Sequence, residues 1–151
     1  MPSKRLYFVD SSHPTWPIEH VRILLAEDPF FEEYLAGLLE PPFEIVGKVH
    51  DGRALLEAVP NLKPDVILTG IEMPILNGLD AVWELTKSGC HAKVIFLTID
   101  SDLDFVRAGL AAGAFGYVVK HRVAIDLIPA IQSVLAGDFF LSPHDEVKSH
   151  L

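Results

Sequence analysis

The sequence predicts a doubly wound α/β domain, in which a five-stranded parallel sheet is built from five strand-helix units. The chain carries five short apolar runs, and a stretch with the apolar spacing of one helical face follows each of them. Almost every residue in these runs is apolar, whereas a strand with one solvated face would alternate between apolar and polar residues. Such runs are typical of parallel strands that helices cover on both faces, which is the doubly wound architecture.

The strands are expected where β-branched and large aliphatic residues follow one another without a polar interruption. The third run ends at Gly70, and an irregular segment with Met73 and Pro74 follows it. The expected strands are Val21–Ala26, Phe43–Val49, Val66–Leu68, Lys93–Thr98 and Phe115–Val119.

Capping residues and prolines set the expected ends of the helices. Asn77 is suited to cap the third helix, and Pro129 fits the last helix if Asp126 is its N-cap, because first-turn amides need no intrahelical partner. The expected helices are Phe30–Leu39, one that opens at Asp51, Asn77–Lys87, Asp102–Gly113 and Val123–Ala136.

Composition excludes several classes of protein. The 151 residues carry a net charge of -9 and no cluster of Lys and Arg, so we expect these residues not to contact nucleic acid. The single cysteine, Cys90, excludes an internal disulfide framework. No apolar run is long enough for a membrane span and no signal-peptide core is present, so we expect a soluble cytoplasmic protein. We expect an N-terminal extension over 1–20, one folded domain over 21–142 and a polar tail over 143–151.

Polar groups gather at one edge of the predicted sheet. The first strand runs into Glu27 and Asp28, the fourth ends at Thr98 and the fifth is followed by Lys120. The carboxyl ends of parallel strands lie at the same edge of a sheet, so these side chains should be neighbours. Two carboxylates, a hydroxyl and an ammonium suit a phosphoryl site, because carboxylates hold Mg²⁺ while the other groups bind phosphoryl oxygens.

This arrangement resembles the receiver domain of two-component response regulators, in the LuxR-type branch. The segments that carry the resemblance are RILLAED, DVILTGIEMPILNG, KVIFLT, GAFGYVVK and AIQSVLAGDFFLSP. The resemblance implies a flavodoxin-like receiver fold, in which an aspartate takes a phosphoryl group from a histidine kinase. It implies that Glu27 and Asp28 are the Mg²⁺-binding acid pair, that Thr98 and Lys120 contact the phosphoryl group, and that Tyr117 is the switching aromatic.

The resemblance assigns the phosphoacceptor position to Gly70, three residues before the Met-Pro pair. Glycine has no nucleophile, so an aspartyl phosphate cannot form there. The remaining metal donors are Glu27, Asp28 and the backbone carbonyl of Glu72, and we expect weak Mg²⁺ binding at most. Lys120 is expected to pair with Asp28 and to hold the domain in one conformation.

Each of these residues also has a simpler interpretation. Asp28 before Pro29 is the pattern of a helix N-cap, Thr98 could be an ordinary strand-end threonine and Lys120 a solvated lysine, while Tyr117 could be a half-buried strand aromatic. Only their combination favours the phosphoryl site.

Other acceptors and metal ligands are less well placed. Glu72 is two residues beyond the strand end, and Thr69 should point to the opposite face from residue 70. The seven histidines have no ligand spacing.

The leading functional hypothesis is a receiver-like module that acts by protein contact or dimerisation, without ordinary aspartyl phosphorylation. The contact surface is expected on the fourth helix, fifth strand and fifth helix. Two alternatives stay open: the regulatory part of a longer LuxR-type DNA-binding regulator, and a small-molecule or anion sensor that uses the cleft beside Lys120. No nucleophile with an adjacent base is visible, so we expect no enzyme activity.

Overall fold

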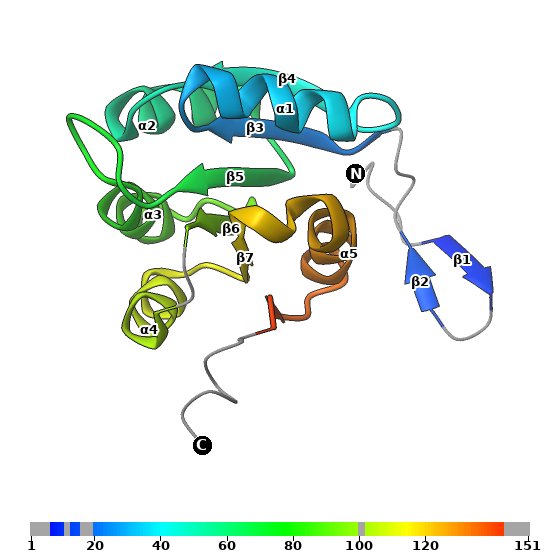
Figure 1. The fold of residues 1–151 in the computed structure, drawn as a ribbon. Helices are drawn as coiled ribbons and strands as arrows, with labels where there is room; N and C mark the ends of the chain where they lie inside the picture. The colour runs from blue at the N-terminus through cyan, green and yellow to red at the C-terminus, as the bar shows by residue number, and fades with distance from the viewer. Residues whose placement is uncertain (1–6, 11–12, 16–19, 100–101, 144–151) are drawn as a thin grey trace.

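The computed structural model describes residues 7–10, 13–15, 20–99 and 102–143, and a parallel sheet with the strand order β4-β3-β5-β6-β7-β8 forms its centre (Figure 1). The predicted doubly wound fold and its five strands are confirmed. Five helices connect the six strands of this sheet, because parallel neighbours need crossover connections. The strands are β3 Arg22–Ala26, β4 Glu44–Val49, β5 Val66–Gly70, β6 Lys93–Thr98, β7 Gly116–Val119 and β8 Phe140–Leu141.

The helices begin at side-chain caps in four of the five cases. The side chains of Asp28, Asp51, Asn77 and Asp102 each accept a hydrogen bond from a backbone N–H of the first helical turn. Gly113 ends the fourth helix in the left-handed conformation, with φ of 116°. The helices are α1 Pro29–Leu39, α2 Gly52–Leu62, α3 Gly78–Lys87, α4 Leu103–Ala112 and α5 Val123–Leu135.

Two apolar clusters lie on the two faces of the sheet. One cluster joins Leu35 of α1 and Leu127 of α5 to alternate residues of the central strands. The other joins Leu55 of α2, Val82 of α3 and Val106 of α4 to the residues in between. Burial on both faces explains why the strand sequences are almost wholly apolar.

The C-terminal part of the domain differs from the prediction in two ways. Residues 140 and 141, for which no strand was predicted, form the sixth strand of the central sheet, β8, which pairs in parallel with β7. Asp126 does not cap α5, because this helix begins at Val123, directly after the 3-10 turn η2 (Lys120–Arg122). The Asp126 carboxylate instead accepts hydrogen bonds from the side chains of Arg122 and Ser142.

The N-terminal extension contains a small antiparallel sheet of its own, made of β1 (Tyr7–Asp10) and β2 (His13–Thr15). In the described part of the chain, neither strand pairs with the central sheet. The polar tail expected over 143–151 lies, except for Pro143, outside the described residues.

Candidate functional site

The two acidic residues after β3 have different positions and different partners. Glu27 is buried, with 4% of its surface exposed, whereas Asp28 is exposed. Oδ1 of Asp28 accepts a hydrogen bond from the backbone N–H of Phe31 at 2.9 Å. Asp28 is therefore the N-cap of α1, as its position before Pro29 also allowed.

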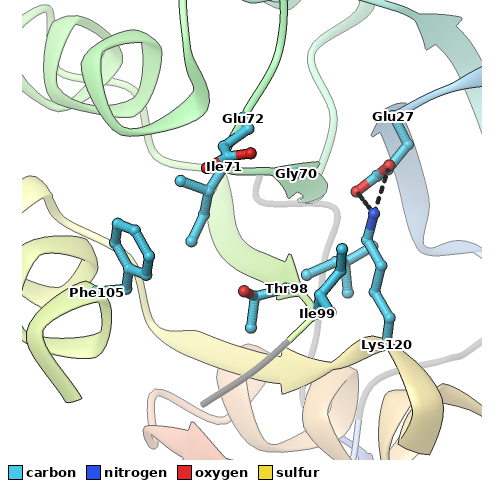
Figure 2. A pocket seen from close by; sticks show the side chains of 9 residues that line it. Glu27, Gly70, Ile71, Glu72, Thr98, Ile99, Phe105 and Lys120 are labelled. Carbon is cyan, nitrogen blue, oxygen red and sulfur yellow. Dashed lines mark hydrogen bonds and ion pairs between the residues drawn. The ribbon is translucent and has the colours of Figure 1, made fainter. Parts of the chain in front are cut away.

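Lys120 pairs with Glu27, so the expected pair with Asp28 is wrong. The Lys120 ammonium nitrogen Nζ lies 3.0 Å from Oε1 and 3.0 Å from Oε2 of Glu27, as the dashed lines in Figure 2 show. It also lies 4.8 Å from the centre of the Phe31 ring. The reason is geometric: Asp28 turns outward to cap α1, while Glu27 is buried at the end of β3, where the Lys120 side chain reaches it.

Glu32 of α1 is a second buried acid of the site, which was not predicted, and it bonds to the backbone of Glu27. Oε2 of Glu32 accepts a hydrogen bond from the backbone N–H of Glu27 at 3.1 Å, and Oε1 lies 2.9 Å from Nε2 of His50. Glu32 is 1% exposed and shares the buried stripe of α1 with Leu35 and Leu39. An acid at helical spacing from two core leucines was the signal that could have identified it.

Burial governs the acid-base behaviour of both glutamates. Removal from water raises the pKa of Glu27, and the hydrogen bond and charge of Lys120 oppose this rise only in part. Burial also raises the pKa of Glu32, against the opposing effects of the Glu27 N–H and of His50. Both carboxyl groups are thus poorly solvated, and their partners offset only part of the free-energy cost of ionising them.

Gly70, the predicted acceptor position, lies at the end of β5 next to Glu27. A Cβ atom at residue 70 would lie 2.5 Å from Oε2 of Glu27. The glutamate carboxylate therefore occupies the space into which a side chain at this position would extend. The expected free space for an anion beside Lys120 is consequently smaller than the sequence suggested.

The other predicted residues surround the same region. Gly70, Glu72, Thr98 and Lys120 line one pocket with Glu27, and the pocket has a volume of about 300 Å³. In Figure 2 the Glu72 carboxylate lies apart from the Glu27–Lys120 pair. The apolar part of the pocket wall comprises Ile71, Leu97, Ile99 and Phe105.

Tyr117 is not among the residues that line this pocket, and it is more buried than its simpler interpretation required. Only 2% of its surface is exposed, and it belongs to the same apolar cluster as Phe96 and Val106. Gly109 of α4 lets the helix approach this cluster, because a Cβ atom there would lie 3.0 Å from the Phe96 ring. The aromatic ring thus packs between the sheet and α4.

The donor set does not fit a well-built Mg²⁺ site. Glu27 is engaged by Lys120, and Asp28 caps a helix. Among the residues that the structure describes, no group of three or more His, Cys, Asp and Glu side chains is placed to hold a metal ion. Mg²⁺ needs several oxygen ligands in near-octahedral geometry, which this arrangement does not offer.

The alternative acceptor Thr69 does not face the pocket. Its hydroxyl donates a hydrogen bond to the carbonyl of Gly70 at 3.0 Å and its side chain is fully buried.

Of the histidines, His50 has a structural partner in Glu32, while His144 and His150 lie outside the described residues. Of the helices in the described part of the chain, none combines the length and apolarity that a bilayer crossing requires.

Comparison with known proteins shows clear similarity to one family. The family model of the response regulator receiver domain matches residues 23–132. The uncharacterized transcriptional regulatory protein YvfU of Bacillus subtilis is 35% identical over 129 residues, which cover 82% of this chain and 63% of YvfU. The transcriptional regulatory protein DegU of Brevibacillus brevis is 35% identical over 136 residues, covering 86% of this chain and 58% of DegU. The chain therefore spans about three fifths of the length of these two relatives.

Solved structures share the fold. A two-component response regulator of the LuxR family from Aurantimonas superimposes with a TM-score of 0.75 at 25% identity, covering 81% of this chain and 89% of that chain. The receiver domain of the putative response regulator NarL from Mycobacterium tuberculosis gives a TM-score of 0.74 at 24% identity, covering 79% and 98%. The second similarity concerns the fold alone.

Proposed function

The chain belongs to the response regulator receiver domain family, and from this membership we propose that it is a receiver-like module that acts through protein contact without ordinary aspartyl phosphorylation. One observation supports this most directly. The residue at the end of the central strand is Gly70, and the lysine that would face an acceptor there is already paired with Glu27. A glycine offers no nucleophile for phosphoryl transfer.

We also propose that the site stays in one conformation. Lys120 is held by two contacts to a buried carboxylate, and Tyr117 is packed into the apolar cluster under α4. Neither contact needs a phosphoryl group. We expect Mg²⁺ to bind weakly, because few donors remain, and we expect no catalysis by the domain itself.

The experiment is intact-mass spectrometry after incubation with acetyl phosphate and Mg²⁺, with Gly70→Asp as the matched variant. The natural chain should gain no phosphoryl mass. A gain in Gly70→Asp alone would locate the loss of function at residue 70. A phosphoryl group mapped to any residue of the natural chain would contradict the proposal.

The contact surface of this proposal lies on α4, β8 and α5. Leu103 and Leu110 of α4 are exposed apolar residues one heptad apart, and Ile125 and Ile128 of α5 are exposed one helical turn apart. The edge of β7 is not available to a partner where β8 pairs with it. A partner, or a second copy of the chain, would therefore meet these two helices and β8 instead of β7.

Sedimentation equilibrium of Ile125→Asp tests this surface. Ile125 is 65% exposed, so the variant should keep its fold while losing self-association, because a charge would have to be desolvated at the contact. Trp83→Asp, which changes an exposed aromatic residue on α3, is the control and should associate like the natural chain. Equal association of all three proteins would exclude α5 as the contact.

A second candidate function is the regulatory part of a longer transcriptional regulator. The relatives that bear this description are longer than the chain, which spans 63% and 58% of the two described above. The acidic composition indicates that a DNA-binding surface would have to lie in residues other than these. Reading the coding frame beyond Leu151 for a helix-turn-helix, and measuring DNA binding by the longer product, tests this candidate.

A further inference from the structure

The carboxylate of Glu27 lies against the point from which a side chain at residue 70 would extend. Its Oε2 is 2.5 Å from the position of a Cβ atom on residue 70, and its carboxyl carbon is 3.1 Å from the same point. Glu27 thus brings a carboxylate to Gly70 from the neighbouring strand.

This carboxylate also has the electrostatic partner that an acceptor would have. Both of its oxygens lie 3.0 Å from the Lys120 ammonium. Asp28 is turned to the N-terminus of α1 and Glu72 is exposed, so among the described residues Glu27 is the acid that forms an ion pair with Lys120. A buried ion pair of this kind is costly to break from one side only.

The position of Glu27 is fixed by its own backbone environment. Its N–H is bonded to the buried carboxylate of Glu32, and Oε1 accepts a second hydrogen bond from the N–H of Asp28 at 3.2 Å. The backbone N–H of Glu27 is therefore held from α1, while its carboxylate meets the ammonium of Lys120, which directly follows β7 (Figure 2). Such support indicates a built position rather than a chance rotamer.

We infer that Glu27 replaces the missing acceptor as the internal counter-ion of Lys120, so that the site already contains the anion around which it is formed. The inference rests on the proposed function, because a permanent internal anion is of use to a domain that acts without phosphorylation. Glu27 is then a positioning residue: it holds Lys120, and through it the end of β7, in place. Glycine at position 70 is the condition for this arrangement, since a side chain there would displace the carboxylate.

Chemical rescue of Glu27→Ala tests the inference. The variant leaves a carboxylate-sized space beside an unpaired lysine, and formate is small enough to enter it. We expect the melting temperature of Glu27→Ala to rise by several degrees more in sodium formate than in sodium chloride of equal concentration. The natural chain and Glu33→Ala, which removes an exposed glutamate of α1, should respond equally to the two salts.

The double variant Glu27→Ala/Lys120→Met locates the effect. It should lose the specific response to formate, because the cation that binds the anion is gone. An equal response of Glu27→Ala to formate and chloride would overturn the inference, as would rescue that persists without Lys120. No phosphodonor is used, so this result is independent of the acetyl phosphate experiment, which tests the absence of phosphorylation in the proposed function.

A second variant keeps the inference testable if Glu27→Ala does not fold. Glu27→Gln fills the same space without the charge, so the ion pair that holds the Lys120 amine against residue 27 is lost and the amine is freer to meet a reagent. We expect acetic anhydride to acylate Lys120 several-fold faster in Glu27→Gln than in the natural chain, with Lys48 as the internal reference. Equal rates at Lys120 would overturn the inference.

Discussion

Oε2 of Glu27 lies 2.5 Å from the point at which residue 70 would carry a Cβ atom, so the Glu27 carboxylate fills the space that a side chain at residue 70 would take. The two residues come from adjacent strands, since β3 pairs with β5. A side chain at residue 70 would meet the carboxylate that pairs with Lys120, so that carboxylate would have to shift. Glycine at this position thus leaves the space that the carboxylate occupies and offers no nucleophile.

Gly70→Ala should destabilise the domain by about 1–3 kcal/mol, the usual cost of extra volume in a packed site. The added methyl group would force the Glu27 carboxylate away from Lys120. Gly37→Ala is the control: Gly37 is an exposed residue of α1 with open space around it, and this change should stabilise the domain by about 0.5–1 kcal/mol. Urea unfolding measures both, and a gain in stability for Gly70→Ala would contradict the shared space.

Asp126→Asn should destabilise the domain at neutral pH by about 1.5–3 kcal/mol, the range for hydrogen bonds to a charged group. Burial opposes ionisation of Asp126, but the hydrogen bonds from Arg122 and Ser142 outweigh it and lower the pKa below the ordinary 3.8. A lowered pKa gives a stabilising contribution that is present above pH 3.8 and lost as the pH falls through the folded-state value. The deficit of the variant should therefore shrink in acid.

The control for this prediction is Asp104→Asn, which removes an exposed carboxylate 3.9 Å from Arg107 on α4. Exposed ion pairs contribute little, so this variant should match the natural chain at every pH. Unfolding curves between neutral pH and pH 3 provide the comparison. A deficit of Asp126→Asn that does not depend on pH would show that shape, and not charge, determines the contribution.

Much of the fold could be predicted because local signals agreed with each other. Apolar runs gave the five main strands, and Asn77 and Asp102 stand at the helix starts where their side chains bond first-turn amides. The strand β8 was missed because two residues carry no periodicity, and their pairing depends on β7, which lies more than 20 residues earlier. Asp126 was misassigned because its partner Ser142 is distant in sequence.

The site could be located from the sequence, but its internal pairing could not. Strand ends predicted that Glu27, Asp28, Thr98 and Lys120 are neighbours, and of these Glu27, Thr98 and Lys120 line one pocket whereas Asp28 does not. Which of two adjacent acids meets the lysine depends on the path of the chain into α1, where Asp28 becomes the cap. The contact of Glu27 with Gly70 depends on a side-chain conformation, on which sequence spacing gives no information.

Ile75→Asn should stabilise the domain by about 1 kcal/mol, because left-handed backbone is costly for residues other than Gly, Asn and Asp. Ile75 has φ of 71°, and a hydrogen bond of 2.7 Å from the N–H of Leu76 to the carbonyl of Pro74 spans it. Its side chain is 77% exposed, so little burial is lost. Ile99→Asn, at an equally exposed position without positive φ, is the control, and an equal effect of both changes would refute the role of backbone conformation.

Glu32→Gln should be at least as stable as the natural chain at neutral pH and less stable near pH 4.5. Burial raises the pKa of Glu32 above its ordinary value of 4.5, so the folded protein binds the proton more tightly than the unfolded chain does. The stabilising contribution of the protonated group is complete below pH 4.5 and is lost as the pH rises through the folded-state value. Glutamine does not titrate, and it keeps an oxygen for the Glu27 N–H.

The difference in unfolding free energy between the natural chain and Glu32→Gln should therefore fall as the pH rises from 4.5 and then become constant. His50→Ala provides the matched comparison, because the ring of His50 lies 2.9 Å from Oε1 of Glu32 and lowers its pKa. Without this ring, the fall should extend to higher pH. If the difference rises with pH instead, the fold stabilises the ionised form of Glu32 and the prediction is wrong. Glu32 would then hold the Glu27 N–H as an anion.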